Sequence, residues 1–136
     1  MKYVTGIYAL NLPSPDGTPG DWHFSSLNWE RPLIEDSEKS PFGEWGLHVA
    51  EVPRLGRAVV ANHVRACLDM IGAGNFGTVQ GMREYYIDDE SYTPVIFAMV
   101  SRLRNTPQWK EIDDFMGREF RCQWLDFKER SGEQDV

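Results

Sequence analysis

The feature that most constrains the fold is an apolar stripe with helical spacing near the C-terminal end. Large apolar side chains recur there every three or four residues, at Trp109, Ile112, Met116, Phe120, Trp124 and Phe127. This period places them on one face of an α-helix. Thr106-Pro107 precedes the stripe, and a Thr cap followed by Pro is typical of a helix start. The pattern predicts one helix over residues 106–130 with its aromatic face in the core.

Three weaker helical patterns precede this stripe. The first carries an apolar face made of Val60, Val64, Cys67, Leu68 and Ile71. Arg65 and Asp69 form an i,i+4 pair away from that face. The second pattern runs from Phe76 to Tyr86 and is weakened by two internal glycines, and the third begins near Ser91. We therefore expect four helices in residues 56–130.

The first 55 residues follow a different pattern. Residues 3–10 are rich in β-branched and aromatic side chains, and residues 45–52 alternate, so each segment is expected to form a strand. Prolines and glycines interrupt the chain between them. Strands in one half and helices in the other predict an α+β fold, with a small antiparallel sheet packed against about four C-terminal helices. We predict one domain over residues 1–136, with residues 131–136 as a frayed tail.

Composition limits the cellular setting. The chain has 136 residues, 41% of them hydrophobic and 26% charged, as is usual for one globular domain. No segment approaches the roughly 20 apolar residues of a membrane span, and the N-terminus lacks signal-peptide features. Only Cys67 and Cys122 occur, and two reduced thiols suit the cytosol. We expect a cytoplasmic protein without a membrane partner.

The charge balance disfavours nucleic acid as a partner. There are 21 acidic against 14 basic side chains, and residues 1–50 alone carry 7 acids and 3 bases. Binding to phosphates depends on Lys and Arg that displace counterions. A helix-turn-helix with residues 76–86 as its reading helix would offer one base, Arg83. A nucleic-acid-binding regulator stays as a lower-ranked alternative.

No coherent catalytic or metal-binding set emerges. His63 and Cys67 share i,i+4 spacing, but a structural zinc needs four ligands and no further motif supplies them. Cys67 lies within an apolar stripe, which argues against a reactive thiol. The acids of residues 88–90 are explained by the start of the following helix. We predict no metal, no cofactor and no catalytic residue.

The most informative cluster is aromatic and not periodic. Large rings stand among glycines and prolines in residues 20–29 and 42–46. Such rings serve either as core anchors, which is the leading interpretation, or as contacts in a binding surface. The candidate binding residues are Asp21, Trp22, His23, Trp29 and Trp45. A different use of Asp21, His23 and Trp29, as an enzyme or small-ligand site, is the alternative.

Five segments of the chain carry a resemblance. They are Gly20-Asp21-Trp22-His23, Phe42-Gly43-Glu44-Trp45-Gly46, residues 60–66 (Val-Ala-Asn-His-Val-Arg-Ala), Gly81-Met82 and residues 115–119 (Phe-Met-Gly-Arg-Glu). With these the chain resembles a family of small, largely uncharacterised bacterial proteins, often encoded beside nucleotidyltransferase-like genes of the toxin or defence kind. The resemblance supplies no catalytic motif, and it implies a protein partner and an antitoxin-like role.

Together these observations favour a non-enzymatic protein-binding partner. The acidic composition, the absence of a catalytic set and the non-periodic tryptophans all agree with that hypothesis. The resemblance suggests a nucleotidyltransferase-like toxin as the bound protein, and it leaves a homo-oligomer open.

Overall fold

The computed structural model describes residues 1–132, which form an α+β fold. Its sheet has four strands: β1 (Lys2–Val4), β2 (Ile34–Asp36), β3 (Leu47–Val52) and β4 (Gly56–Ala61), in the order β2-β1-β4-β3. β1 pairs antiparallel with β2 and parallel with β4, and β3 pairs antiparallel with β4. The sheet is therefore mixed, whereas the sequence predicted an antiparallel one.

Within residues 1–132, six α-helices accompany the sheet. They are α1 (Gly6–Leu10), α2 (His63–Gly72), α3 (Phe76–Val79), α4 (Thr93–Val100), α5 (Trp109–Phe120) and α6 (Cys122–Ser131). Short 3₁₀ turns cover η1 (Phe24–Ser26), η2 (Ser37–Lys39), η4 (Glu90–Tyr92) and η5 (Ser101–Leu103), and a π turn covers η3 (Arg83–Ile87). The helices of the C-terminal half agree with the predicted fold class.

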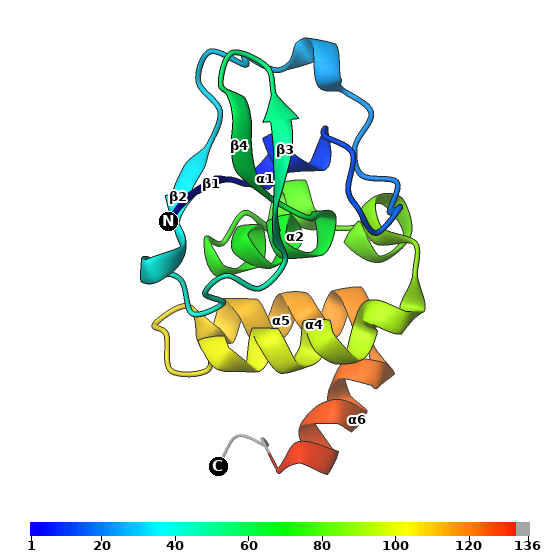
Figure 1. The fold of residues 1–136 in the computed structure, drawn as a ribbon. Coiled ribbons are helices and arrows are strands. Elements are labelled where there is room, and N and C mark those ends of the chain that lie inside the picture. The colour runs from blue at the N-terminus through cyan, green and yellow to red at the C-terminus, as the bar shows by residue number, and fades with distance from the viewer. Residues whose placement is uncertain (133–136) are drawn as a thin grey trace.

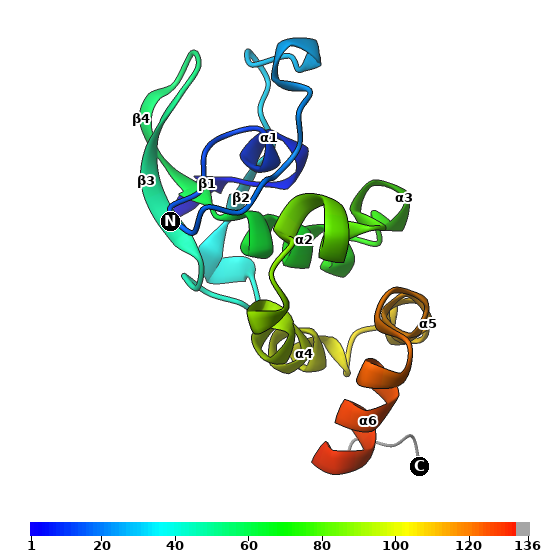
Figure 2. The same cartoon turned by 90° about the vertical axis from the view of Figure 1, so that its right-hand side faces the viewer.

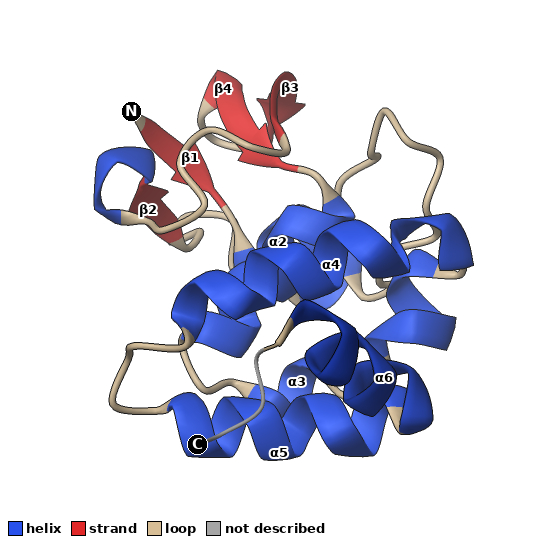
Figure 3. Ribbon diagram, turned by 90° about the horizontal axis from the view of Figure 1, so that it is seen from below, coloured by secondary structure: helices blue, strands red, loops and turns tan. Residues whose placement is uncertain are grey.

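Helix α2 is the centre of the molecule. Figure 1 shows the sheet and α1 on one side of α2 and the α4–α5 layer on the other, with α6 at the far end. The views in Figures 2 and 3 show the same layering. Eight of the ten residues of α2 are buried. A helix that is enclosed on nearly all sides must be covered by other elements, and here the two halves of the chain supply that cover.

The C-terminal aromatic face lies in the core, as predicted. Phe120 and Trp124 are buried, and the Phe97 ring of α4 lies edge-on to both, with centroid distances of 5.0 and 5.2 Å. Trp109 is half-buried, 6.2 Å from Trp124. Edge-to-face aromatic pairs add to the stabilisation that burial supplies.

The predicted strand over residues 3–10 is wrong beyond Val4, because the chain turns there into α1. Gly6 has a φ of +66°, and a side chain at this position would press on Leu33. Glycine therefore allows the change of direction. At the other end of α1, the Asn11 side-chain amide donates to the Ile7 carbonyl oxygen at 2.8 Å. Aromatic and β-branched content alone did not reveal this short helix.

The predicted helical boundary at residue 56 is also wrong, because residues 56–61 form β4. The helix begins at His63, where the Asn62 side chain caps it by accepting from the Arg65 backbone N–H at 2.8 Å. Val60 is buried at the end of β4, in phase with the buried face of α2. This coincidence made the strand look like the first turn of the helix.

Two predicted helices are divided. The segment 76–86 holds only the four-residue α3, and Gly81 at φ +81° separates it from the π turn at 83–87. The long C-terminal helix begins at Trp109, and Arg121, at φ +55°, separates α5 from α6. Ser131 ends α6 and does not start a tail, and residues 133–136 of the predicted tail lie outside the described residues.

Candidate functional site

Four of the predicted binding residues lie on the long loop between α1 and β2. In Figure 1 this loop rises to the top of the molecule, at the end opposite α6. Two backbone hydrogen bonds hold its first part in place: the Gly20 N–H donates to the Tyr86 carbonyl at 2.9 Å, and the Asp21 N–H donates to the Leu10 carbonyl at 2.8 Å. Both bonds tie the loop to structured parts of the chain.

Asp21 is the anchor of this loop. Its carboxylate accepts from the Asn11 amide at 3.0 Å and lies 2.9 Å from His23 Nδ1, while the His23 backbone N–H donates to Asn11 Oδ1 at 2.8 Å. Burial acts to raise the pKa of Asp21, but the hydrogen bonds from Asn11 and His23 outweigh it and hold that pKa below its usual value. Asp21 is therefore ionised at neutral pH and fixed in position.

The rings after Asp21 are presented to solvent. Trp22 is 83% exposed and Phe24 is 47% exposed. Behind them, Trp29 is half-buried: its ring lies 4.9 Å from Phe24 and 5.4 Å from Tyr8, and its Nε1 donates to the Phe24 carbonyl at 3.0 Å. Trp29 thus supports the loop, and we name the exposed set Trp22, His23 and Phe24 the aromatic loop surface.

The structure does not bring Trp45 to this surface. Among residues 1–132, the ring of Trp29 contacts the rings of Tyr8 and Phe24 but not the ring of Trp45. Trp45 is half-buried against the core, and its carbonyl accepts from Arg65 at 2.6 Å. Phe24, which the sequence reasoning left out of the candidate residues, takes its place, and its position two residues after Trp22 was the available signal.

A second feature, absent from the sequence prediction as a site, is a buried arginine. Arg65 of α2 is fully buried. Its Nε and two amino nitrogens donate to the Asp69 carboxylate (3.0 Å), the carbonyls of Gly43 and Trp45 (2.8 and 2.6 Å) and the hydroxyls of Tyr3 and Ser40 (2.9 and 3.1 Å). These five bonds match the five N–H donors of a guanidinium.

Asp69 completes the charge balance of this network. Its Oδ2 accepts from the Tyr3 and Thr5 hydroxyls, both at 2.7 Å, and its Oδ1 accepts from Arg65. Burial, together with the hydrogen bond to Asp69, raises the pKa of the Tyr3 hydroxyl far above its usual value, so it remains a donor. The predicted i,i+4 pair therefore forms, but inside the protein and not on an exposed face.

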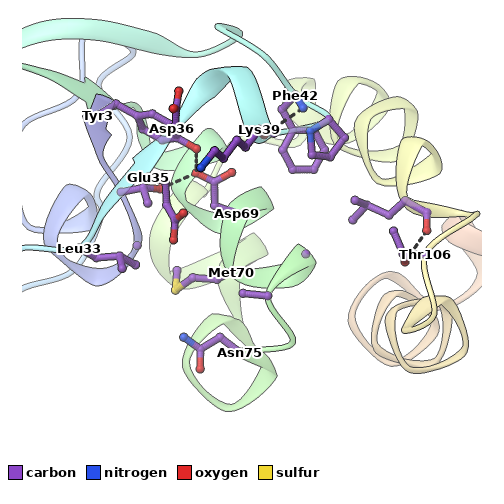
Figure 4. A pocket seen from close by; sticks show the side chains of 17 residues that line it. Tyr3, Leu33, Glu35, Asp36, Lys39, Phe42, Asp69, Met70, Asn75 and Thr106 are labelled. Carbon is purple, nitrogen blue, oxygen red and sulfur yellow. Dashed lines mark hydrogen bonds between the residues drawn. The ribbon is translucent and has the colours of Figure 1, made fainter. Parts of the chain in front are cut away.

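A cleft of about 330 Å³ opens beside Asp69. Its walls come from β1, from β2 and η2, from the C-terminal part of α2 and from the segment between α4 and α5. Figure 4 shows the Lys39 side chain extending toward Asp69, and the Glu35 carboxylate lies between Asp69 and Met70. Residues from position 3 to position 106 meet here, so no local sequence pattern could indicate the cleft.

His63 and Cys67, which share i,i+4 spacing on α2, are both buried in the core. Nε2 of His63 donates to the Leu12 carbonyl at 2.7 Å, and Nδ1 lies 2.6 Å from the Thr18 hydroxyl. Cys67 is buried and Cys122 is exposed, and both thiols are free. Burial lowers the pKa of His63 and raises that of Cys67. Within residues 1–132, no three His, Cys, Asp or Glu side chains gather as metal ligands.

Comparisons with known proteins give no match: no family model, no curated protein and no solved structure is significantly similar to this chain. None of the helices in residues 1–132 has the length and apolar character needed to cross a membrane.

Proposed function

We propose that this protein acts by binding another protein through the aromatic loop surface. The observation that carries the proposal is Trp22, a residue that is 83% exposed and directly follows the anchored Asp21. Tryptophan is the residue most typical of interface hot spots, because it buries a large apolar area and still offers one donor.

The loop is held in shape before any partner arrives. Asp21 is fixed by Asn11 and by the Leu10 carbonyl, and Trp29 is fixed by its hydrogen bond to Phe24. A preorganised surface loses less conformational entropy on binding, so more of the contact free energy appears as affinity. This is the arrangement expected of a recognition surface.

Charge supports a partner with a basic surface. Residues 1–50 carry 7 acids against 3 bases. The loop itself holds Asp16, Asp21 and Glu30 against one base, Arg31, and Glu30 pairs with Arg54 at 3.2 Å. Complementary charge speeds encounter and selects among partners. The family resemblance favours a nucleotidyltransferase-like toxin as that partner and an antitoxin-like antagonism as the role, and we carry this forward as the specific form of the proposal.

One observation favours a second candidate, an enzyme or small-ligand site at the same loop. The Asp21 carboxylate lies 2.9 Å from His23 Nδ1, and a carboxylate that holds an imidazole in this way can orient a general base. Within residues 1–132, however, no Ser, Thr or Cys side chain hydrogen-bonds the His23 ring, so a nucleophile would have to come from the ligand.

The test compares baits that differ only in an exposed ring. Native protein, Trp22→Ala, Phe24→Ala and Tyr85→Ala would be used to isolate bound proteins from the source cells. Tyr85 is 68% exposed but outside the loop, so it is the matched control. A protein retained by the native and Tyr85→Ala baits, and lost from both loop variants, supports the proposal. Equal retention on all four baits would contradict it.

A further inference from the structure

The cleft beside Asp69 has the dimensions and lining of a small-ligand site. Its volume of about 330 Å³ lies at the small end of the range for ligand pockets. Apolar side chains of Leu33, Met70 and Leu103 form part of the wall, and charged groups form another part. Such mixed lining binds a small molecule by its apolar body and orients it by its polar groups.

Ion pairing accounts for only half of the charged groups at this cleft, which are Glu35, Asp36, Lys39 and Asp69. Asp69 pairs with Arg65 at 3.0 Å, and Asp36 pairs with the N-terminal ammonium at 3.1 Å. Within residues 1–132, neither Glu35 nor Lys39 has an ion-pair partner, and they do not pair with each other. One carboxylate and one ammonium are therefore left to interact with a ligand.

Asp69 adds a fixed acceptor between these two groups. Its carboxylate has about four acceptor sites and uses three, for Tyr3, Thr5 and Arg65. Because those three donors hold it rigidly, the remaining site on Oδ1 is set in place before a ligand arrives. In Figure 4 the Lys39 side chain extends toward this carboxylate from η2, and the Glu35 carboxylate on β2 lies between Asp69 and Met70.

We propose that this cleft binds a small zwitterion whose ammonium meets Glu35 and Asp69 and whose carboxylate meets Lys39. The apolar wall selects a short aliphatic body between them. This is the chemistry of an aliphatic α-amino acid. The site is separate from the aromatic loop surface, so the proposal stands independently of the proposed protein partner.

The experiment is calorimetric titration of the whole chain with L-leucine and with two half-ligands. Leucinamide lacks the carboxylate, and 4-methylpentanoate lacks the amine. We expect leucine to bind and each half-ligand to bind at least about tenfold more weakly, which corresponds to about 1.4 kcal/mol for each lost charge contact. No binding of leucine at millimolar concentration would overturn the proposal, and so would leucinamide binding as tightly as leucine.

Two variants assign the contacts. Glu35→Gln should weaken leucine about tenfold and leave 4-methylpentanoate unchanged, because that probe has no amine to lose. Lys39→Met should weaken leucine equally and leave leucinamide unchanged. Both side chains are exposed, so the variants should fold, and Glu51→Gln on β3 is the matched exposed control. Leucine affinity equal to that of the native chain in both cleft variants would overturn the assignment.

Discussion

Replacing Arg65 with methionine should destabilise this protein severely. The guanidinium is fully buried and donates five hydrogen bonds, two of them to backbone carbonyls that precede β3. Methionine replaces the aliphatic stem but donates nothing, so Asp69 becomes a mostly buried carboxylate without its cation. Removing one partner of a buried ion pair costs about 3–5 kcal/mol. We expect a loss of that size in the free energy of unfolding.

The assay is urea unfolding followed by tryptophan fluorescence, on Arg65→Met, Asp69→Asn and the double variant. Because each single variant strands a charged or polar partner, the double variant should lose less stability than the sum of the singles, by about 2–3 kcal/mol. Lys110→Met is the control. Lys110 and Asp114 also pair at i,i+4 with 3.2 Å between them, but the pair is exposed and should contribute less than about 0.5 kcal/mol.

The refuting result is clear for this network. If Arg65→Met changed the free energy of unfolding no more than Lys110→Met does, the guanidinium would not be holding the segments together. Additive effects of Arg65→Met and Asp69→Asn would likewise show that the two charges do not act as a pair.

Three further predictions concern stability. Gly20→Ala should lower the free energy of unfolding by at least about 3 kcal/mol, because at φ +67° the added Cβ would overlap a backbone carbonyl and the His63 ring. Gly17 has a similar φ of +74° but open space around it, so Gly17→Ala should lower the free energy of unfolding by only about 1 kcal/mol. Equal denaturation midpoints for the two variants would contradict this prediction. In chemical denaturation, Trp124→Ala should lower the free energy of unfolding by about 3–5 kcal/mol, because Trp124 is buried, and Trp22→Ala should lower it by less than about 0.5 kcal/mol, because Trp22 is exposed. A larger loss for Trp22→Ala than for Trp124→Ala would contradict this assignment of buried and exposed rings. Burial lowers the pKa of His63 in the folded protein, so below about pH 6.5 the unfolded chain binds more protons than the folded one. The free energy of unfolding should therefore fall as the pH drops from about 6.5 toward the lowered pKa of His63. An NMR titration that finds the ordinary pKa for the His63 ring would contradict this prediction.

The C-terminal core could be predicted from sequence because large aromatic side chains recur there with helical spacing. Phe120 and Trp124 are buried where their spacing placed them, although Arg121 divides the helix between them. A backbone break of one residue leaves the apolar period nearly intact, so periodicity does not detect it. For the same reason, apolar periodicity alone did not separate the end of β4 from the start of α2, and both were predicted as one helix.

The candidate sites differ in how local they are. The aromatic loop site is local, because Asp21, Trp22 and His23 are adjacent in the chain. Its polar side chains between a glycine and aromatic residues could therefore be recognised in the sequence. The Arg65 network was not predictable, because a charged pair at i,i+4 reads as solvent-exposed unless the covering segments are known. Those segments come from far along the chain, as the hydrogen bond between Arg65 and Tyr3 illustrates.

The central claim, that the aromatic loop surface binds a protein partner, is tested most directly by a dissociation constant. Once a partner retained by the native bait is purified, its Kd would be measured for the native chain, Trp22→Ala and Tyr85→Ala, with the melting temperature of each. A hot-spot ring contributes about 2 kcal/mol, so Trp22→Ala should weaken binding about thirtyfold with an unchanged melting temperature, and Tyr85→Ala should bind as the native chain does. An unchanged Kd for Trp22→Ala would contradict the claim.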